Sequence, residues 1–520
     1  PGRQPFLYID MIRIMKIIPR TKPSSATLPL VFFLSKKDAI RRIPLFGFLN
    51  PMEREYLEQI KEQADVKEKE AKVFVTPGNA RKIIVVGTGK VSAGIMTGIA
   101  MRIAVQTAKR EKINSFGFWA GIPKKRNGTK KFYEAVAAHA AMANFEFVKY
   151  KTPPPEGFPF VEEIEAITGK PSKEIAEGLR RGLIIGEEIN ACRELANTPG
   201  GDMTPRALAT HAVAGSEELG IRTTILDEKK IKELGMGGIL GVSKGSVEPP
   251  RFIIQEYMRG PKTKKPIVLV GKGVTFDTGG LNLKPSSAIY EMHMDMSGGA
   301  AVIHAIRAAA RLKVKKNIVG LVPAVENMPS GSSYRPGDLL RTLSGKTIEV
   351  LDTDAEGRVI LADALSYAKT FDPSVVIDVA TLTGAAMAAL GQRYSALFSN
   401  EKKLGARLCA IGEETGDRAW PMPLSADYEE EIKGTFGDLA NVGKTRYGGA
   451  ITGAVFLWQF IKDDSPDSTQ NKSGKPAKTI PWAHLDIAPR MTTIEGEYLA
   501  KGAAGAPVML LTRFLEEYSS

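Results

Sequence analysis

Two stretches of this chain place acidic side chains among glycines and short apolar runs. The first, at 271–287, reads GKGVTFDTGGLNLKPSS, and the second, at 351–364, reads LDTDAEGRVILADA. Together with MHMDMSGGA between them, they supply the acids Asp277, Asp295, Asp354 and Glu356, among others. Unpaired carboxylates are costly to bury, so such groups either take up protons or coordinate a metal ion. The pattern therefore restricts the fold to one that gathers these acids around a cation.

The apolar runs next to these acids predict an α/β arrangement. KPIVLVG and KTIEVLD are typical of buried strands that run into glycine-rich turns. Strand ends of this kind are where α/β proteins bind ligands. Asp354 and Glu356 are two residues apart, so on an extended backbone both side chains would leave the same face. We interpret the set as a two-metal site, although any one acid taken alone could equally cap a helix or lie in a solvated turn.

The order of several motifs resembles that of the leucyl aminopeptidase family, the dizinc cytosol aminopeptidases. The motifs are VGKGVTFDTGG, the lysine in LKPS, the aspartate in MDM, TDAEGR, ATLTGA at 380–385 and WAHLDIA at 482–488. The resemblance is strong over residues 190–515 and weak before them. It implies an α/β fold with a smaller N-terminal α/β domain and a larger C-terminal α/β/α, zinc-exopeptidase-like catalytic domain. It also implies a metal-dependent aminopeptidase that hydrolyses the peptide bond after an N-terminal leucine or another apolar residue.

The resemblance also implies the metal ligands. One ion would be held by Lys272, Asp277, Asp295 and Glu356, and the other by Asp277, Glu356 and both the side chain and the carbonyl of Asp354. Lysine is an unusual ligand because its amine must be neutral, and a dication at bonding distance favours that form. Four carboxylates balance the charge of two divalent ions. The ions would be zinc, or manganese, magnesium or cobalt at the exchangeable site, because carboxylates bind all of these metals.

A water molecule that bridges two such ions would attack the peptide carbonyl, because a bound zinc can lower the pKa of water to roughly 7. By resemblance, Lys284 would stabilise the developing oxyanion, and Arg358 would hold a bicarbonate that acts as the base. Arg358 could instead balance charge beside the acids. Backbone atoms of Thr381, Leu382 and Gly384 would align the peptide, and the side chains of Met292, Ala488 and Met491 would form the pocket for its first residue.

Two residues depart from the family's pattern, and neither is an implied ligand. Asp352 replaces the asparagine usual before TDAEGR, and Pro489 replaces the glycine usual after HLDIA. If 351–354 were extended, Asp352 would bring a fifth negative charge onto the face of Asp354. The five histidines include no HExxH pair. His293 is two residues from Asp295 and would share its face of a strand.

The length of the chain predicts two domains. Its 520 residues, 43% hydrophobic and 25% charged, suffice for two sizeable cores. We expect an N-terminal α/β domain over 1–171, a linker helix over 172–195 and the catalytic domain over 196–520. In the last of these, apolar runs alternate with helical patterns, including helices from Gly298 to Leu312 and from Gly357 to Lys369. This alternation is typical of an α/β protein with a buried central sheet.

The net charge of +13 lies almost entirely in the first part of the chain. Lysine and arginine outnumber aspartate and glutamate by 33 to 21 in residues 1–195, but only by 38 to 37 in residues 196–520. A basic surface can bind nucleic acid through phosphates, with strong salt dependence and little sequence preference. We do not expect specific nucleic-acid binding. An architectural DNA-binding role is one rival function, and a dimetal hydrolase of phosphate esters is the other.

The remaining expectations concern location and assembly. Cys192 and Cys409 are the two cysteines and allow no disulfide framework, and no apolar run approaches the roughly 20 residues that cross a bilayer. We therefore expect a cytoplasmic enzyme without a membrane partner. Organelle targeting by the basic, acid-poor N-terminus is the alternative. The resemblance implies a homohexamer with inward-facing active sites, whose substrates are short peptides with a free N-terminus.

Overall fold

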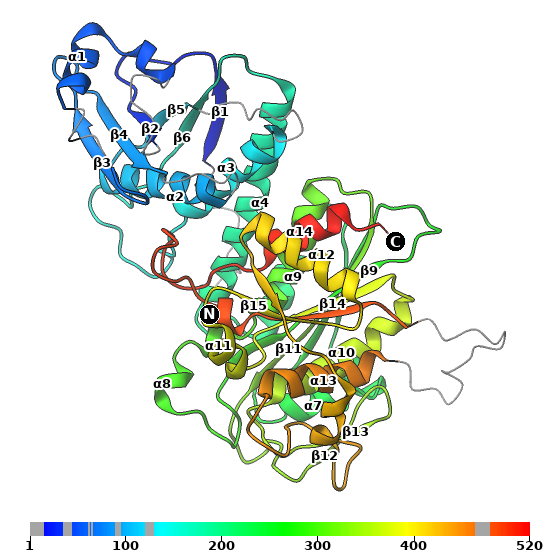
Figure 1. The fold of residues 1–520 in the computed structure, drawn as a ribbon. Coiled ribbons are helices and arrows are strands. Elements are labelled where there is room, and N and C mark those ends of the chain that lie inside the picture. Colours follow the sequence, from blue (N-terminus) through cyan, green and yellow to red (C-terminus); the bar gives the residue numbers. More distant parts are fainter. Residues whose placement is uncertain are drawn as a thin grey trace, which may run out of the picture. The chain divides into compact units, whose positions relative to one another are not determined.

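The computed structural model describes residues 15–34, 44–60, 63, 66–88, 95–119, 129–462 and 479–519. The basic start of the chain, residues 1–14, lies outside the described residues. The chain divides into two compact units: residues 1–190 with 494–501, and residues 191–493 with 502–520. Each unit is built around its own β-sheet (Figure 1). Both are α/β, in agreement with the fold class predicted from the sequence.

The sheet of the first unit, among the described residues, has the strand order β1-β6-β5-β2-β4-β3. Its strands are β1 (Lys16–Arg20), β2 (Leu30–Leu34), β3 (Ala71–Val75), β4 (Lys82–Gly87), β5 (Ser115–Trp119) and β6 (Glu163–Ile167). Neighbouring strands are parallel, except that β3 is antiparallel to β4. Runs such as LVFFL form these strands because β-branched and aromatic side chains pack well on a buried, pleated surface.

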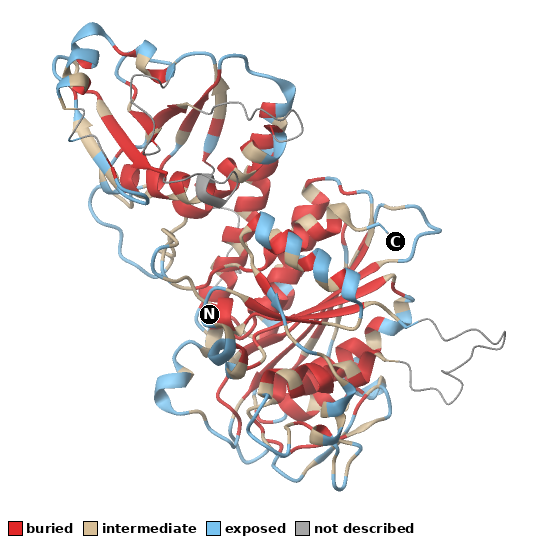
Figure 2. Ribbon diagram, viewed as in Figure 1, coloured by how far each residue is buried: buried red, intermediate tan, exposed pale blue. Residues whose placement is uncertain are grey.

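Helices pack against both faces of this first sheet. They are η2 (Pro44–Phe48), α1 (Pro51–Gln59), α2 (Ile95–Arg110), α3 (Thr129–Asn144) and α4 (Lys173–Asn197). In β2, Leu30 and Phe32 join the apolar cluster of η2 and α1, whereas Val31 joins that of α2 and α3, as the two-residue period of a strand requires. Buried residues therefore occur in β1, β2, β4, β5 and β6, but not in the edge strand β3 (Figure 2). Helix α4 approaches α3 closely at Gly182, where a Cβ would lie 2.1 Å from the Glu134 carbonyl oxygen.

The sheet of the second unit is larger. Its described strands follow the order β16-β15-β18-β14-β9-β11-β8-β7, and β10 pairs with β11 beside this path. They are β7 (Arg222–Leu226), β8 (Arg251–Met258), β9 (Ile267–Gly271), β10 (Gly273–Asp277), β11 (Asn317–Asn327), β14 (Val375–Ala380), β15 (Ser395–Ser399), β16 (Ala419–Pro421) and β18 (Trp482–Asp486). The central strands β11, β9, β14 and β18 are parallel and almost entirely buried. Burial on both faces explains their continuous runs of Val, Ile and Leu.

Helices cover both faces of this second sheet. α9, α12 and α14 lie on one side, and α7, α10 and α13 lie on the other (Figure 1). The helices are α5 (Pro205–Val213), α6 (Glu228–Glu233), α7 (Gly237–Ser243), α8 (Ser286–Ile289), η4 (Met292–Met294), α9 (Ser297–Arg311), α10 (Glu356–Ala368), η5 (Lys369–Phe371), α11 (Gly384–Leu390), α12 (Lys402–Thr415), η6 (Ala426–Ile432), α13 (Gly449–Ile461), η7 (Ala488–Arg490) and α14 (Val508–Glu517). The two-sided cover keeps the central strands away from water.

One strand predicted for the central sheet lies elsewhere. KTIEVLD forms β13 (Thr347–Glu349), which pairs with β12 (Leu339–Arg341) and β17 (Leu439–Ala440) in a separate small sheet. The Glu349 carboxylate ties this run to the neighbouring loop by accepting the amides of Thr435 and Phe436 at 2.6 and 2.9 Å. An apolar run predicts that a segment is buried, but it does not predict which sheet the segment joins.

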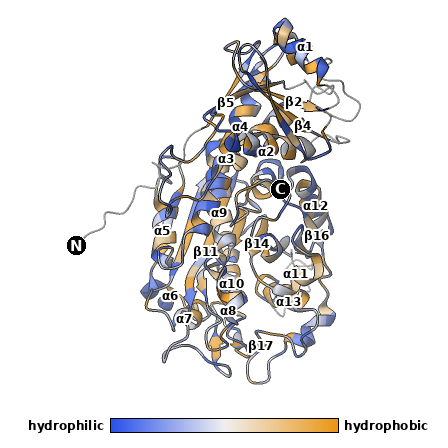
Figure 3. Cartoon of the chain, turned by 90° about the vertical axis from the view of Figure 1, so that its left-hand side faces the viewer, coloured by the Kyte–Doolittle hydropathy of each residue, from blue (hydrophilic) through white to orange (hydrophobic). Residues whose placement is uncertain are grey.

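The surface helices are amphipathic rather than apolar all round. Figure 3 shows hydrophilic and hydrophobic residues mixed along α1, where Leu57 is buried and Arg54 is exposed. Within the part of the chain that the structure describes, no helix combines the length and the apolar character needed to cross a membrane.

Candidate metal centre

The carboxyl ends of the central parallel strands supply several of the predicted site residues. Lys272 directly follows β9, Asp277 ends β10, and Thr381 directly follows β14. Strands β9 and β10 both run parallel to β11, along its first and second halves. Because the carboxyl ends of parallel strands meet at one edge of a sheet, this topology gathers side chains that are far apart in the sequence.

The turn after β10 holds Asp277. Its Oδ1 accepts the Gly279 amide and the side-chain amide of Asn327, both at 2.8 Å, and its Oδ2 lies 2.9 Å from Lys284 Nζ. Gly279 and Gly280 have φ angles of +89° and +64°, where a residue with a side chain would be strained. The two glycines of DTGG therefore let the chain reverse directly after the acid.

Lys272 bridges two further acids. Its Nζ lies 2.7 Å from Asp295 Oδ2 and 2.7 Å from Glu356 Oε1, and it donates to the Thr381 carbonyl oxygen at 3.0 Å. Asp295 directly follows η4, and Glu356 is the first residue of α10. Lys272, Asp295 and Glu356 are all buried. One strand end, one helix end and one helix start thus bring these three side chains together.

Asp354 lies in a turn, so the extended backbone considered for 351–354 is not found. The Asp352 carboxylate accepts the Asp354 amide at 2.8 Å and closes this turn. The side chain of Asn441 bonds both the amide and the carbonyl of Asp352. Asp352 and Asp354 therefore do not share a strand face, because a short polar side chain can satisfy the backbone locally instead. Asp354 and Glu356 do converge, but at the start of a helix rather than along a strand.

Lys284 bridges the remaining pair of acids, Asp277 and Asp354. It lies in the loop between β10 and α8, and its Nζ contacts Asp277 Oδ2 and Asp354 Oδ1. One carboxylate oxygen from each of Asp277, Asp354 and Glu356 lies within 4.8 Å of the other two. The structure thus brings together all five side chains that the sequence indicated as metal ligands.

The acids are buried closely enough to disturb one another's protonation. Burial raises the pKa of Asp277, and the neighbouring Glu356 raises it further against the opposing effect of the two lysines. Burial likewise raises the pKa of Asp354 to about 6, and that of Asp295 well above its usual range. The positive charge of two ammonium groups therefore does not fully balance the negative charge of four carboxylates at this buried place.

The donor set fits divalent metal ions. Asp295 Oδ2, Asp354 Oδ1 and Glu356 Oε1 are buried and contact the ammonium groups of Lys272 and Lys284, with no other hydrogen-bond partner among the described residues. Burial disfavours the ammonium form of Lys272, although its acidic neighbours raise its pKa above the usual value. Each lysine places one positive charge between two carboxylates, and divalent ions bound to oxygen ligands would supply more charge at the same place.

Arg358 is a buried cation beside this cluster. Its Nε has no hydrogen-bond partner in the described part of the chain. Burial lowers the pKa of Arg358, whereas Glu356 and Asp486 act to raise it. A Cβ at Gly453 of α13 would lie 3.3 Å from the guanidinium Nη2 and 3.3 Å from Leu382 Cδ2. Gly453 therefore leaves the space in which Arg358 lies next to the segment that follows β14.

The residues expected to bind substrate follow two neighbouring strands or lie at η4. Thr381, Leu382 and Gly384 come after β14. Ala488 begins η7, the short helix that follows β18, and Met491 comes directly after η7. Met292 is the first residue of η4. Strands β14 and β18 are adjacent and parallel, so the segments that follow them begin side by side. Pro489 is buried in the first turn of η7, where its missing amide removes no helical hydrogen bond.

The two histidines near the predicted motifs bond outside the acid cluster. Residues 292–294 form η4 rather than a strand, so His293 does not share a strand face with Asp295. Its Nδ1 lies 3.3 Å from the Tyr290 carbonyl oxygen. His484 is buried in β18, and its Nδ1 lies 2.5 Å from Asp378 Oδ1.

Three residues that support the centre or the segments beside it have no role in the sequence-based assignment: Asn327, Asn441 and Asp486. Asn327 holds Asp277, Asn441 holds the turn of Asp352, and Asp486 accepts bonds from both substrate segments. Asn327 and Asp486 each end a buried strand, and this position in the sequence could have marked them as supporting residues. Asn441 follows the two-residue strand β17, and no sequence pattern marks it.

Gly357 provides a test of how Lys272 is held. A Cβ at Gly357 would lie 2.6 Å from Lys272 Cε and 2.8 Å from Lys272 Nζ, so Gly357→Ala should push the lysine away from its two acids. Alanine is favoured over glycine in a helix by about 1 kcal/mol, so we expect the fold to be retained. Loss of a supporting contact should lower metal affinity by about 10- to 100-fold.

Titration of the metal-free variant with Mn²⁺ measures this effect. Gly405→Ala in α12 is the control, because a Cβ there meets nothing closer than 3.5 Å. Wild-type affinity in Gly357→Ala would contradict the role given to this glycine.

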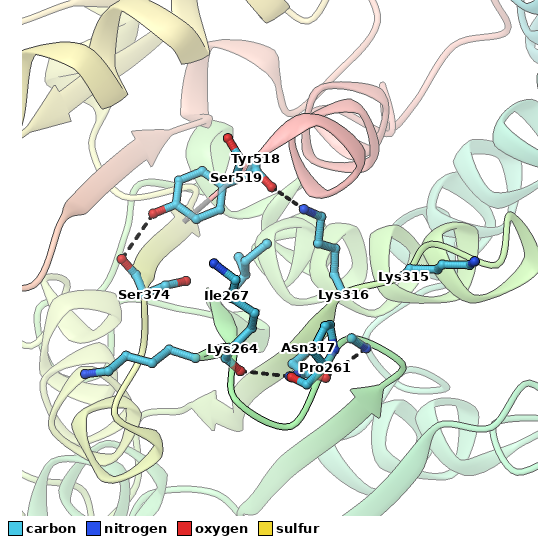
Figure 4. A pocket seen from close by; sticks show the side chains of 11 residues that line it. Pro261, Lys264, Ile267, Lys315, Lys316, Asn317, Ser374, Tyr518 and Ser519 are labelled. Atoms are coloured by element: carbon cyan, nitrogen blue, oxygen red, sulfur yellow. Dashed lines mark hydrogen bonds between the residues drawn. The ribbon is translucent and has the colours of Figure 1, made fainter.

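A separate hollow of about 250 Å³ lies at the opposite, amino-terminal edge of the sheet (Figure 4). Lys316 Nζ donates to the Tyr518 carbonyl oxygen at 2.5 Å, and the Tyr518 hydroxyl donates to the Ser374 carbonyl oxygen at 3.1 Å. These bonds fasten the segment after α14 to the starts of β11 and β14. None of the predicted site residues lines this hollow.

Known proteins resemble this chain in both sequence and fold. The model of the cytosol aminopeptidase family's catalytic domain matches residues 190–512, and that of its N-terminal domain matches residues 48–154. A probable cytosol aminopeptidase from Methylobacillus flagellatus is 43% identical over 401 residues, which are 76% of this chain and 77% of that protein. A probable cytosol aminopeptidase from Roseiflexus castenholzii is 40% identical over 446 residues, which are 85% and 88% of the two chains.

A solved structure shares the fold. The bottromycin maturation enzyme BotP in complex with Mn aligns with a TM-score of 0.79 and 28% identity, over 95% of this chain and 99% of that chain. The predicted architecture, an N-terminal α/β domain followed by a larger catalytic domain, is therefore confirmed. With acids, lysines and strand ends arranged as described, and with both domain models matched, this chain belongs to the cytosol aminopeptidase family of metal-dependent aminopeptidases.

Proposed function

We propose that this protein uses two divalent metal ions to release N-terminal leucine and similar apolar residues from short peptides. The observation that carries the proposal is the convergence of the five candidate ligands at one edge of the sheet. Lys272 lies between Asp295 and Glu356, and Lys284 lies between Asp277 and Asp354. Carboxylates paired in this way around positive charge, with raised pKa values at Asp277, Asp295 and Asp354, are a donor set that fits two cations.

The proposed ligands divide between the two ions. Lys272, Asp277, Asp295 and Glu356 would hold one ion, and Asp277, Asp354 and Glu356 would hold the other. Once bound, the pair would supply a bridging, activated water and would polarise the peptide carbonyl. Zinc is proposed as the resident metal, with manganese, magnesium or cobalt at the exchangeable site, and the Mn complex of BotP supports manganese among them.

Lys284 is proposed to stabilise the negative charge that develops on the carbonyl oxygen. Although burial disfavours its ammonium form, Asp277 and Glu356 raise its pKa above the usual value, which favours the charged form. Its side chain is 15% exposed and can therefore be reached by a substrate. A preorganised cation stabilises a charged transition state more than a neutral amide, which is the condition for catalysis.

Arg358 is proposed to hold a bicarbonate that accepts a proton from the attacking water. The guanidinium is buried, and its Nε lacks a partner among the described residues. A planar fork of donors suits the bidentate binding of an oxyanion. The carboxylates of the centre would coordinate the ions, so a separate group is required as the base.

The first side chain of the peptide would enter a pocket formed by Met292, Ala488 and Met491. Met292 and Ala488 are half-buried, and Met491 is 9% exposed. Methionine adapts to apolar groups of different shape, which supports a preference for leucine and related residues. Backbone atoms of residues 381–384 would align the peptide beside the ions.

We also propose a homohexamer in the cytoplasm, with substrates restricted to short peptides by inward-facing sites. The support is the family to which the chain belongs, whose curated relatives are named as probable cytosol aminopeptidases. Specific nucleic-acid binding is not part of the proposal.

Removal of metal tests the proposed function. Chelation followed by dialysis should abolish hydrolysis of a leucyl arylamide, and Mn²⁺, Zn²⁺ or Co²⁺ should restore it, because the water and the carbonyl would no longer be activated without the ions. A panel of arylamides should show the highest kcat/KM for leucine and methionine, and low values for lysine and glutamate.

A phosphate monoester is the control substrate for this experiment. Full activity in protein shown by elemental analysis to be metal-free would contradict the proposal. Hydrolysis of the phosphate ester in place of the arylamide would favour the phosphoesterase rival.

A further inference from the structure

The segment 381–384 is fastened to the proposed metal ligands at its start. Thr381 Oγ1 donates to Asp295 Oδ1 at 2.6 Å, and the Thr381 carbonyl oxygen accepts Lys272 Nζ at 3.0 Å. These contacts fix one end of the segment against two of the candidate ligands. They do not fix Leu382 and the residues after it.

Asp486, the last residue of β18, holds the rest of this segment. It is fully buried. Its Oδ1 accepts the amides of Leu382 and Ala488, each at 3.1 Å, and its Oδ2 accepts the Thr383 hydroxyl at 2.7 Å. A single carboxylate therefore joins the segment after β14 to the segment after β18, which are the two segments expected to contact the substrate.

Thr383 links Asp486 to helix α11. Its Oγ1 accepts the Ala386 amide at 3.1 Å and so caps the N-terminus of α11, while its hydroxyl proton is donated to Asp486. An N-cap side chain determines where a helix begins. Asp486 therefore also sets the position of Gly384, the first residue of α11.

We propose that Asp486 is a positioning residue that holds the peptide-aligning segments at the correct place relative to the metal centre. A carboxylate suits this task because its two oxygens have room for three donors. The proposal rests on the proposed function, since it assumes that 381–384 and Ala488 contact the peptide. Asp486 makes no direct hydrogen bond to a candidate ligand in the described structure, so it should affect alignment rather than metal binding.

Four variants of the metal-loaded protein test this role. Asp486→Ala removes both acceptor oxygens and with them all three hydrogen bonds, whereas Asp486→Asn keeps one oxygen for the two amides. Thr383→Val removes the hydroxyl with little change in shape, whereas Thr383→Ser keeps it. The matched control is Asp363→Asn, because Asp363 is also a fully buried carboxylate that accepts backbone amides, those of Ile239 and Leu343 at 3.0 and 2.7 Å.

Two readouts separate positioning from a purely structural role, because neither depends on the fraction of folded enzyme. One is KM for a leucyl tripeptide, and the other is the ratio of kcat/KM between that tripeptide and a leucyl arylamide, which lacks the downstream backbone. Misplacement of a substrate can cost about 100-fold in rate. We expect Asp486→Ala to raise KM and to lower the ratio by at least about 10-fold, because the tripeptide depends more on the aligned segment.

Thr383→Val should change both readouts in the same direction, and Asp486→Asn and Thr383→Ser should stay close to wild type. Asp363→Asn should leave KM and the ratio unchanged even if its melting temperature falls. A wild-type KM and ratio in Asp486→Ala, with full metal content, would overturn the proposal, as would loss of metal in that variant. Failure of the proposed function would look different, since the wild-type protein itself would then release no N-terminal residue from either substrate.

Discussion

Glu356→Ala is expected to abolish peptide hydrolysis and to leave the protein with at most one tightly bound metal ion. Glu356 contacts Lys272 at 2.7 Å and lies within 4.8 Å of the nearest carboxylate oxygens of Asp277 and Asp354, so it would touch both proposed ions. Asp277→Ala should have an equal effect for the same reason. The fall in kcat/KM should exceed about 1,000-fold, because losing an ion removes more stabilisation than losing one oxyanion donor.

Elemental analysis of the purified variants, together with arylamide hydrolysis at saturating Mn²⁺, measures both effects. Glu349→Gln is the control, since Glu349 is likewise buried but bonds loop amides in the small sheet. It should retain both ions and near wild-type activity. Two bound ions and normal turnover in Glu356→Ala would remove Glu356 from the proposed ligand set.

Lys284→Ala is expected to lower kcat by about 100- to 1,000-fold, as removal of one oxyanion-hole donor does, while metal content stays near that of the wild type. Its ammonium lies 2.9 Å from Asp277 Oδ2 and also contacts Asp354, yet it is not among the proposed ligands. Lys272→Ala should behave in the opposite way and weaken the binding of one ion, because Lys272 lies between two proposed ligands.

Steady-state kinetics and metal analysis on the two lysine variants separate these roles. Lys229→Ala, on the exposed surface of α6, is the control and should match the wild type. A wild-type kcat in Lys284→Ala would show that Lys284 does not stabilise the transition state. Loss of metal in that variant would instead make Lys284 a structural partner of the acids.

Much of the catalytic unit could be predicted from local sequence. The helices expected from Gly298 and Gly357 are α9 (Ser297–Arg311) and α10 (Glu356–Ala368), and PIVLVG gives β9. Apolar periodicity indicates whether a segment can bury its apolar side chains as a helix or as a strand. These segments are long and strongly apolar. The two-domain α/β architecture followed from the same alternation and from the motif order.

The motifs also identified the acids and lysines that converge, but not what holds them. Asn327 supports Asp277 from 50 residues away in the sequence, and Asn441 supports Asp352 from 89 residues away. Hydrogen bonds between such distant residues depend on which strand ends become neighbours. Local patterns carry no information on that, so these supporting residues were missed.

By itself, the sequence determined the family, the α/β class and the identity of the candidate ligands, because motif spacing and hydrophobic period are local properties of the chain. Only the tertiary structure decided that KTIEVLD belongs to a small separate sheet, that Asp352 closes a turn instead of facing the centre, and that Asp486 joins two substrate segments. In each of these cases a side chain forms hydrogen bonds with backbone groups that local geometry alone would have left without a partner. Which groups those are is settled only when the parallel strands assemble and bring their ends to one edge.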